Sequence, residues 1–317
     1  MYVIMKNVEI IVRKIIASDW FIYGVLIALN FFAYAHILNH FFYSDDFTWI
    51  FHGEWIKQDF SILWKLKVTS FFSPVVNAYF YLGQVLFPNN YVVYHLVGLG
   101  IHCLNTCLIF IFLKLLTKQR AASFFGAAFF AVIFSHYQAV IWISAIMHVL
   151  VTTFVLIGLI LYILYLQKKK IVFLVISLLS GVFAFFTKEN GIMFTPMIVA
   201  VFIYFKYQKE AKGVSFKHIF WYIGLFVLLI FYTYINQKSS MWVDSGVYRI
   251  DLHAVFPLVG SSLALFFVQL GEFVTTHTWA LVFTLFLSGL FALCLLYKKN
   301  RYAMMYVLGS FIILCGF

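Results

Sequence analysis

The sequence predicts an all-α, polytopic membrane protein with nine or ten transmembrane helices. Hydrophobic residues make up 64% of the 317 residues, charged residues only 10%, and the mean hydropathy is +0.99. A soluble domain of this length cannot bury so much apolar surface, so lipid must be the solvent for most of the chain. The apolar runs are long and continuous rather than alternating, which favours helices over barrel strands.

The first expected span covers residues 20–42 and follows Lys6, Arg13 and Lys14. A helix needs about 20 apolar residues to cross roughly 30 Å of hydrocarbon. Because this run is long and no small-residue cleavage site follows it, we expect an uncleaved anchor rather than a signal peptide. Further spans are expected at 92–113, 121–136, 139–166, 171–187, 191–207, 218–235, 279–297 and 302–317.

The apolar run 254–273 leaves the number of spans at nine or ten. If it crosses the bilayer fully, the basic group at 298–301 lies outside; if it is re-entrant or interfacial, that group stays inside. The small residues at 260–262 dilute the run, so we favour the second arrangement. The sequence stops at Phe317 inside an apolar run with no polar cap, and we therefore expect it to be a fragment of a longer protein.

The charges predict the orientation of the chain. Most of the 22 Lys and Arg residues fall on one side of the predicted spans, and the positive-inside rule makes that side cytoplasmic. We expect a multi-pass protein of the plasma membrane, with the other side facing the periplasm or the exterior. That side receives most of the acids: Asp45, Asp46, Glu54, Asp59, Glu189, Asp244 and Asp251.

The net charge of +11 does not indicate a nucleic-acid partner. The basic residues stand in small groups between apolar runs, as topology signals do. The four cysteines lie in apolar segments and show neither a disulfide framework nor metal-ligand spacing. We interpret them as small core hydrophobes.

We predict one transmembrane domain, 1–317, with a first external loop at 43–90 and a second at 236–253. Apolar residues recur at helical spacing in two segments of the first loop: Phe47, Ile50, Phe51 and Trp55, then Phe60, Leu63, Trp64 and Phe71. Both segments are predicted to be amphipathic helices that lie on the membrane surface.

Two adjacent carboxylates follow the first span in "FFYSDDFTWIFHGEW". Ser44 is a good N-cap, and acids in the first turn of a helix favour its dipole. Adjacent external carboxylates also repel each other, and such a pair often serves a proton, a cation or a substrate hydroxyl. On these residues alone, Asp45 and Asp46 fit both interpretations.

Other polar residues on the outer side are candidates for binding. Lys188 and Glu189 stand close to lipid, where charge is costly unless it pairs or faces a cavity; a short loop with a snorkelling lysine is the alternative. His136 either binds a polar ligand or packs. Arg249 is the only external arginine, and its planar fork suits phosphate, although a lone loop arginine is usually solvated.

Three polar residues, His95, His102 and Asn105, share about one face of the span 92–113. No carboxylate or cysteine accompanies them, so we predict interhelical hydrogen bonds rather than a metal site. His148 lies deeper in its span and is expected to pack or to form a hydrogen bond.

Several segments, in order, resemble a known family. The acidic pair after the first span is similar to that of the GT-C class of polytopic glycosyltransferases. The stretches "SPVVNAYFYLGQVLFPNNYVVYHLVGLGIHCLN", "SHYQAVIWIS" and "FFTKENGIMFTP" resemble dolichyl-phosphate-mannose-type protein O-mannosyltransferases, including those with tetratricopeptide repeats. The resemblance covers roughly residues 40–210. The chain departs from the family at Ser73, at 133–134 and at Gln138, and it lacks the repeats.

The resemblance implies a GT-C-like fold and an inverting hexosyltransferase. A polyprenyl-phosphate donor would give its sugar to a hydroxyl of a protein, glycan or lipid acceptor at the membrane. The implied roles are Asp45 as base, Asp46 as its orienter or substitute, Lys188 and Arg249 on the donor phosphate, and His136 and Glu189 in support. Whether a divalent cation takes part stays open, because adjacent DD differs from the DxD of metal-dependent members. A lipid or solute transporter or flippase is the alternative, which would favour internal symmetry and mid-membrane charges.

Overall fold

The computed structural model describes residues 18–64, 72–133, 136–208, 210–211 and 213–237. Every regular element within these residues is helical, which confirms the all-α part of the prediction. The first elements are α2 (Asp19–Tyr34), η1 (Ala35–Asn39), α3 (Asp46–Gln58), η2 (Phe60–Trp64), α4 (Pro74–Leu86), α5 (Tyr91–Thr117) and α6 (Arg120–Val132). They are followed by α7 (Tyr137–Ile141), η4 (Ile143–Ala145), α8 (Ile146–Lys168), α9 (Ile171–Thr187), η5 (Glu189–Met193), α10 (Phe194–Tyr207), η6 (Phe216–His218) and α11 (Ile219–Gln237).

Four helical segments of the described chain are long and apolar enough to cross a membrane: Asp19–Asn39, Tyr91–Thr117, Ile143–Lys168 and Glu189–Tyr207. Three shorter apolar helices accompany them: Arg120–Val132, Ile171–Thr187 and Phe216–Tyr232. These helices support a membrane protein, and the count of nine or ten spans stays a prediction. The expected spans 279–297 and 302–317, the run 254–273 and the loop after Gln237 lie outside the described residues.

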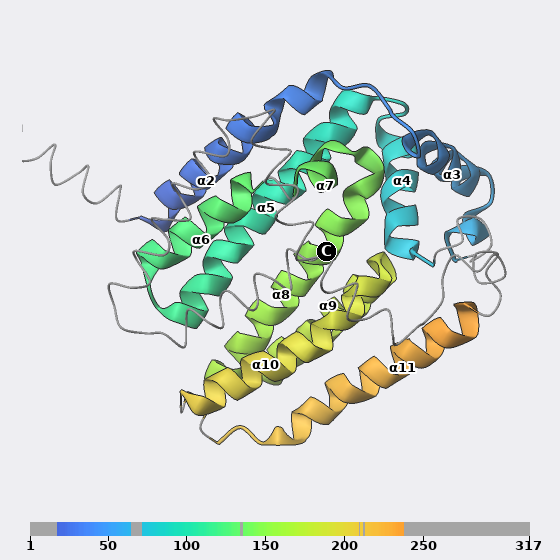
Figure 1. Cartoon of the computed structure of the whole chain (residues 1–317). Helices are drawn as coiled ribbons and strands as arrows, with labels where there is room; N and C mark the ends of the chain where they lie inside the picture. Colours follow the sequence, from blue (N-terminus) through green and yellow to red (C-terminus); the bar gives the residue numbers. More distant parts are fainter. Residues whose placement is uncertain (1–17, 65–71, 134–135, 209, 212, 238–317) are drawn as a thin grey trace, which may run out of the picture.

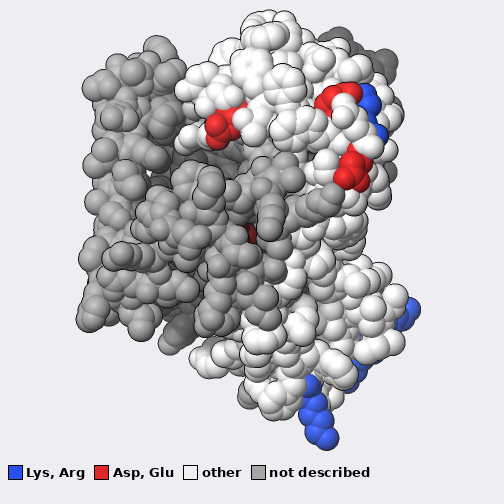
Figure 2. All heavy atoms as spheres, turned by 90° about the vertical axis from the view of Figure 1, so that its right-hand side faces the viewer, with Lys and Arg blue, Asp and Glu red and all other residues white. Residues whose placement is uncertain are grey.

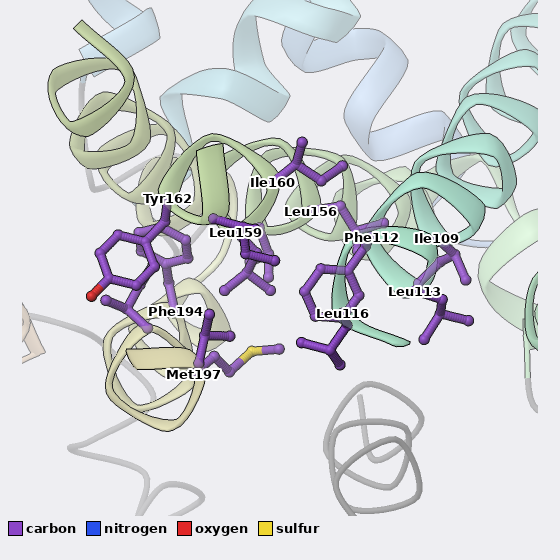
Figure 3. Close-up of a cluster of buried hydrophobic side chains, with 14 of the residues drawn as sticks. Ile109, Phe112, Leu113, Leu116, Leu156, Leu159, Ile160, Tyr162, Phe194 and Met197 are labelled. Carbon is purple, nitrogen blue, oxygen red and sulfur yellow. The ribbon is translucent and has the colours of Figure 1, made fainter. Parts of the chain in front are cut away.

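The long apolar helices lie side by side, and α3 and α4 form a separate pair at one end (Figure 1). Helix α5 packs against α2, α6 and α8, and α8 packs against α9 and α10. Figure 3 shows the centre of this packing, where side chains of α5, α8 and α10 interdigitate. Phe112, Leu159 and Met197 represent the three helices there. Because lipid is as apolar as these side chains, close van der Waals packing holds the helices together.

Polar side chains add hydrogen bonds between the packed helices. Asn105 on α5 donates to the carbonyl oxygen of Val149 on α8 at 2.8 Å, and Thr153 donates to the Asn105 side chain at 2.7 Å. The prediction of an interhelical hydrogen bond is thus confirmed for Asn105. His95 binds the carbonyl oxygen of His40 at 3.0 Å. His102 packs its ring on Phe130 and forms a hydrogen bond with the backbone of Ala131 on α6, as predicted.

One expected span is broken. The predicted helix 139–166 divides into α7, η4 and α8, because Trp142 adopts extended backbone with φ −93° and ψ 115°. Two residues later, the Ser144 N–H donates to the Asp46 carboxylate at 2.7 Å instead of to a helical carbonyl. This contact crosses 98 residues of sequence, so the local apolar pattern gave no sign of it.

The first external loop is more ordered than expected, since α3, η2 and α4 occupy it. Helix α3 confirms the first predicted amphipathic segment, but its apolar residues divide between two faces. Phe47, Phe51 and Trp55 are 44%, 60% and 49% exposed, whereas Ile50 is buried on the side of Trp49, which stacks on Phe80 of α4. The second predicted helix is described only as the short turn η2, and Phe71 lies outside the described residues.

Basic side chains are concentrated at one end of the helix bundle, where two acidic residues, Asp19 and Glu210, pair with some of them. At this end, Asp19 of α2 pairs with Lys114 and with Arg120, whose Nε lies 3.2 Å from the Asp19 carboxylate. At the other end lie Asp45, Asp46 and the turn after α9. Figure 2 shows the same asymmetry: most visible acidic side chains lie toward the top, and most basic ones toward the bottom. Which end faces the cytoplasm stays a prediction.

Gly53 on α3 lies directly against the backbone of α4. A Cβ atom at this position would lie 2.6 Å from the carbonyl oxygen of Phe80, which cannot rotate away. We expect Gly53→Ala to separate α3 from α4, to lower stability by about 1–3 kcal/mol and so to lower the thermal midpoint. Gly100→Ala on α5 is the matched control, because nothing lies within 4 Å of a Cβ there. A midpoint that drops equally in both variants would contradict this packing.

Candidate functional site

A cavity of about 350 Å³ opens between the segment that joins η1 to α3 and the helix α7. Its lining comes from two stretches of chain, His40 to Asp46 and Gln138 to Trp142. Aromatic rings and uncharged polar groups are prominent in its wall, and Asp46 is the acidic residue among the described lining residues. The chain that follows the first long helix thus places Asp46, one member of the predicted acidic pair, in a cavity whose other wall comes from residues 138–142.

Asp46 is the fixed member of the pair. Its side chain is only 2% exposed, at the start of α3. One carboxylate oxygen accepts the Tyr43 N–H at 2.9 Å, and the other accepts the N–H and the hydroxyl of Ser144 at 2.7 and 2.5 Å. Hydrogen bonds to a charged acceptor are short and strong, and they compensate the burial of the carboxylate. Asp46 therefore ties the start of α3 to η4.

Asp45 is exposed and nearly free. It is the N-cap residue of α3 by position, but its side chain makes no capping hydrogen bond. The Ser44 hydroxyl, at 3.4 Å, is the partner of its carboxylate within the described residues. Both of its neighbours in sequence line the cavity. Asp45 itself is not a lining residue, and its exposed carboxylate lies on the surface between two residues that are.

The prediction that Ser44 caps this helix is wrong. Ser44 has a positive φ of 51°, and the helix begins two residues later. The left-handed conformation costs a residue with a side chain about 1–2 kcal/mol. The turn that it makes lets Asp46 reach back to the Tyr43 N–H, so the Asp46 hydrogen bonds offset the strain.

Lys188 lies in the connection between α9 and η5, and its Nζ donates to Nε2 of His148 at 2.9 Å. Burial lowers the pKa of Lys188, and the charge of the adjacent Glu189 opposes the shift. His148 stands four residues after Ser144, the partner of Asp46. The structure therefore brings Asp46 and Lys188 to the same short segment at the start of α8. It also confirms that His148 forms a hydrogen bond.

His136 lies beside the cavity rather than in it. Its Nδ1 is 3.1 Å from the carbonyl oxygen of Phe130, and its ring packs against Phe130 and His102. This placement supports the turn from α6 to α7, which carries Gln138 to the cavity wall. Arg249 lies outside the described residues.

Acidification should reveal the buried state of His136. Burial lowers its pKa from 6.5 to about 4, so the folded protein keeps this ring neutral. The unfolded chain binds a proton below pH 6.5, so stability that is present above this pH is lost as the pH falls toward 4. At pH 5 the loss is about 2 kcal/mol. Thermal midpoints at pH 7.5 and pH 5 should differ less for His136→Gln than for the wild type; equal differences would contradict the buried neutral ring.

Sequence reasoning missed Ser144 as the partner of Asp46. The one local signal was a serine inside the sequence Ile143-Ser144-Ala145-Ile146, in an apolar run that would otherwise continue as a helix. Its role depends on the contact with α3, which the sequence does not specify.

The arrangement combines an exposed carboxylate (Asp45), an adjacent carboxylate that is buried in the cavity wall (Asp46), and a lysine (Lys188) that binds His148, four residues after the Asp46 partner Ser144. Such groups can take a proton from a hydroxyl and hold an anion. Within the described part of the chain, no group of three or more His, Cys, Asp or Glu side chains is placed to hold a metal ion. No protein-family model matches the chain, and no curated protein matches it.

Proposed function

We propose that the protein is an integral-membrane glycosyltransferase of the GT-C kind. It transfers a sugar from a polyprenyl-phosphate donor to an acceptor hydroxyl, at the end of the molecule where Asp45 and Asp46 lie. The active site faces the periplasm or the cell exterior. The observation that carries the proposal is the division of the acidic pair into an exposed Asp45 and a buried Asp46 beside one cavity.

The reaction is a single displacement. The Asp45 carboxylate takes the proton of the acceptor hydroxyl, and the acceptor oxygen attacks the anomeric carbon of the sugar. The bond between that carbon and the phosphate oxygen breaks, and the polyprenyl phosphate leaves with the electron pair. Attack from the face opposite the phosphate inverts the anomeric centre. Asp45 is left protonated and returns its proton to water.

Asp46 acts as the positioning residue for this step. Its three hydrogen bonds fix the first turn of α3, and the backbone of Asp45 belongs to the same turn. A base held in this way needs little reorganisation when the acceptor arrives, which favours the chemical step.

Lys188 supplies positive charge for the leaving phosphate. A cation that faces developing negative charge in a water-poor site stabilises the transition state. His148 orients the ammonium group, and the negative charge of Glu189 opposes the lowering of the Lys188 pKa by burial. Arg249 has the phosphate-binding chemistry for the same task, and His136 supports the cavity wall.

The direct test uses the purified full chain in lipid nanodiscs with radiolabelled polyprenyl-phosphate sugars and a membrane extract as acceptor source. We expect label to leave the polyprenyl carrier and to appear on an acceptor with the inverted anomeric configuration. Label that crosses a vesicle membrane while still attached to its carrier would instead identify a flippase. No consumption of any donor, with folded protein, would overturn the proposal.

A further inference from the structure

We infer that the cavity beside Asp46 binds a neutral sugar ring of the acceptor, so that the acceptor is a glycan or glycolipid rather than a protein side chain. The inference rests on the proposed function and names the acceptor class, which the family resemblance leaves open.

Aromatic rings form the walls of the cavity. Phe41, Tyr43 and Trp142 line it, and the rings of Tyr43 and Trp142 stand 6.5 Å apart at 62°. The face of an aromatic ring carries partial negative charge. The C–H bonds on one face of a pyranose carry partial positive charge, and that face is apolar. An aromatic wall therefore suits a sugar ring that lies flat against it.

Apart from Asp46, the polar lining residues that the structure describes carry directional hydrogen-bonding groups. The exposed Gln138 offers an amide that both donates and accepts, and His40 and Ser44 add a ring nitrogen and a hydroxyl. These groups match a ligand that carries several hydroxyls. A few placed polar groups among aromatic walls are typical of a small-molecule site.

The charge of the cavity argues against the donor phosphate as its occupant. Among the described residues, no Lys or Arg lines the cavity. Asp46, the one charged lining residue, already accepts three hydrogen bonds and repels an anion. A phosphate needs cationic or multiple N–H donors. Lys188, which has the required charge, binds His148 and does not line this cavity.

The size and shape of the cavity argue against a peptide. Its volume of about 350 Å³ is at the small end of the range of ligand pockets, about 300–1,000 Å³. Extended peptides commonly add to a sheet edge, and the described residues contain no strand. A compact ring fits the cavity, and a hydroxyl at its mouth would face the exposed Asp45.

The test compares two acceptor classes with one donor. Wild-type protein in nanodiscs is given a polyprenyl-phosphate sugar with either neutral alkyl glycosides or serine- and threonine-containing peptides. We expect transfer to glycosides and at least tenfold less to peptides. Efficient transfer to peptides with glycosides ignored would overturn the inference and leave the proposed function intact. No donor consumption with either class would contradict the proposed function itself.

A measurement of glycoside binding without donor tests the sugar-binding cavity independently of the proposed transfer reaction. Saturation-transfer NMR with methyl glycosides should detect binding to the wild type and at least tenfold weaker binding to Trp142→Ala and Gln138→Leu. Trp20→Ala and Gln167→Leu, exposed residues at the opposite end, are the matched controls and should bind like the wild type. Gln138 is exposed, so its variant should fold even if Trp142→Ala does not. Unchanged glycoside binding in Gln138→Leu would overturn the inference.

Discussion

Asp45→Asn is expected to lower the rate of sugar transfer by about 10²–10⁴-fold, the usual contribution of a general base. Asparagine keeps the size of the side chain and is an equally good N-cap, so the helix should not suffer. Because Asp45 is exposed and, within the described part of the chain, its side chain binds Ser44 alone, the thermal midpoint should stay that of the wild type. Initial transfer rates and melting curves of the same preparations would test both statements.

Glu54→Gln is the matched control for this variant. It makes the same carboxylate-to-amide change on the same helix, where Glu54 pairs with Lys57 at 2.9 Å on the surface. Exposed pairs contribute at most about 1 kcal/mol, so this variant should keep both activity and stability. Full activity in Asp45→Asn would remove Asp45 as the base. A loss of the same size in Glu54→Gln would point to surface charge instead.

The long apolar helices were the predictable part of the fold. The span 171–187 coincides with α9, and 92–113 lies within α5, because each is a continuous apolar run with polar residues at its ends. Helix α4 was missed inside the presumed loop, although Pro74 in its first turn is a recognised start signal. The aromatic and polar composition of 43–90 is typical of a loop, and it outweighs the single start signal at Pro74.

What the sequence left open depends on contacts between distant residues. The two aspartates are chemically equivalent in sequence, and the hydrogen bonds from Ser144 and Tyr43 fix only Asp46. The same contact breaks the helix that the apolar pattern predicted over 139–166. Lys188 and His148 meet across 40 residues, so their pairing was not foreseen either. The residue types of the site were readable from the sequence, but the division of roles within the acidic pair required the fold.

Asp46→Asn is expected to differ from Asp45→Asn by lowering stability as well as activity. The amide removes the charge that three donors share, and its NH₂ group cannot accept the Tyr43 N–H. Hydrogen bonds to a charged group contribute about 1.5–3 kcal/mol each, against about 0.5–1.5 kcal/mol for neutral ones, so the change from three charged bonds to two neutral ones should cost roughly 3.5–6 kcal/mol. Chemical unfolding in detergent would measure it.

Ser144→Ala completes this prediction, because it removes one of the three hydrogen bonds and leaves the Asp46 charge in place. It should cost about 1.5–3 kcal/mol. If Asp46 acts only through the position of Asp45, this variant should also lower kcat while the KM for the donor stays unchanged, since the donor phosphate is held elsewhere. The double variant should cost less than the sum of the two single variants, because each breaks the same contact. Strict additivity would show that the Asp46–Ser144 contact does not couple α3 to η4, and an unchanged kcat in Ser144→Ala would reduce Asp46 to a structural residue.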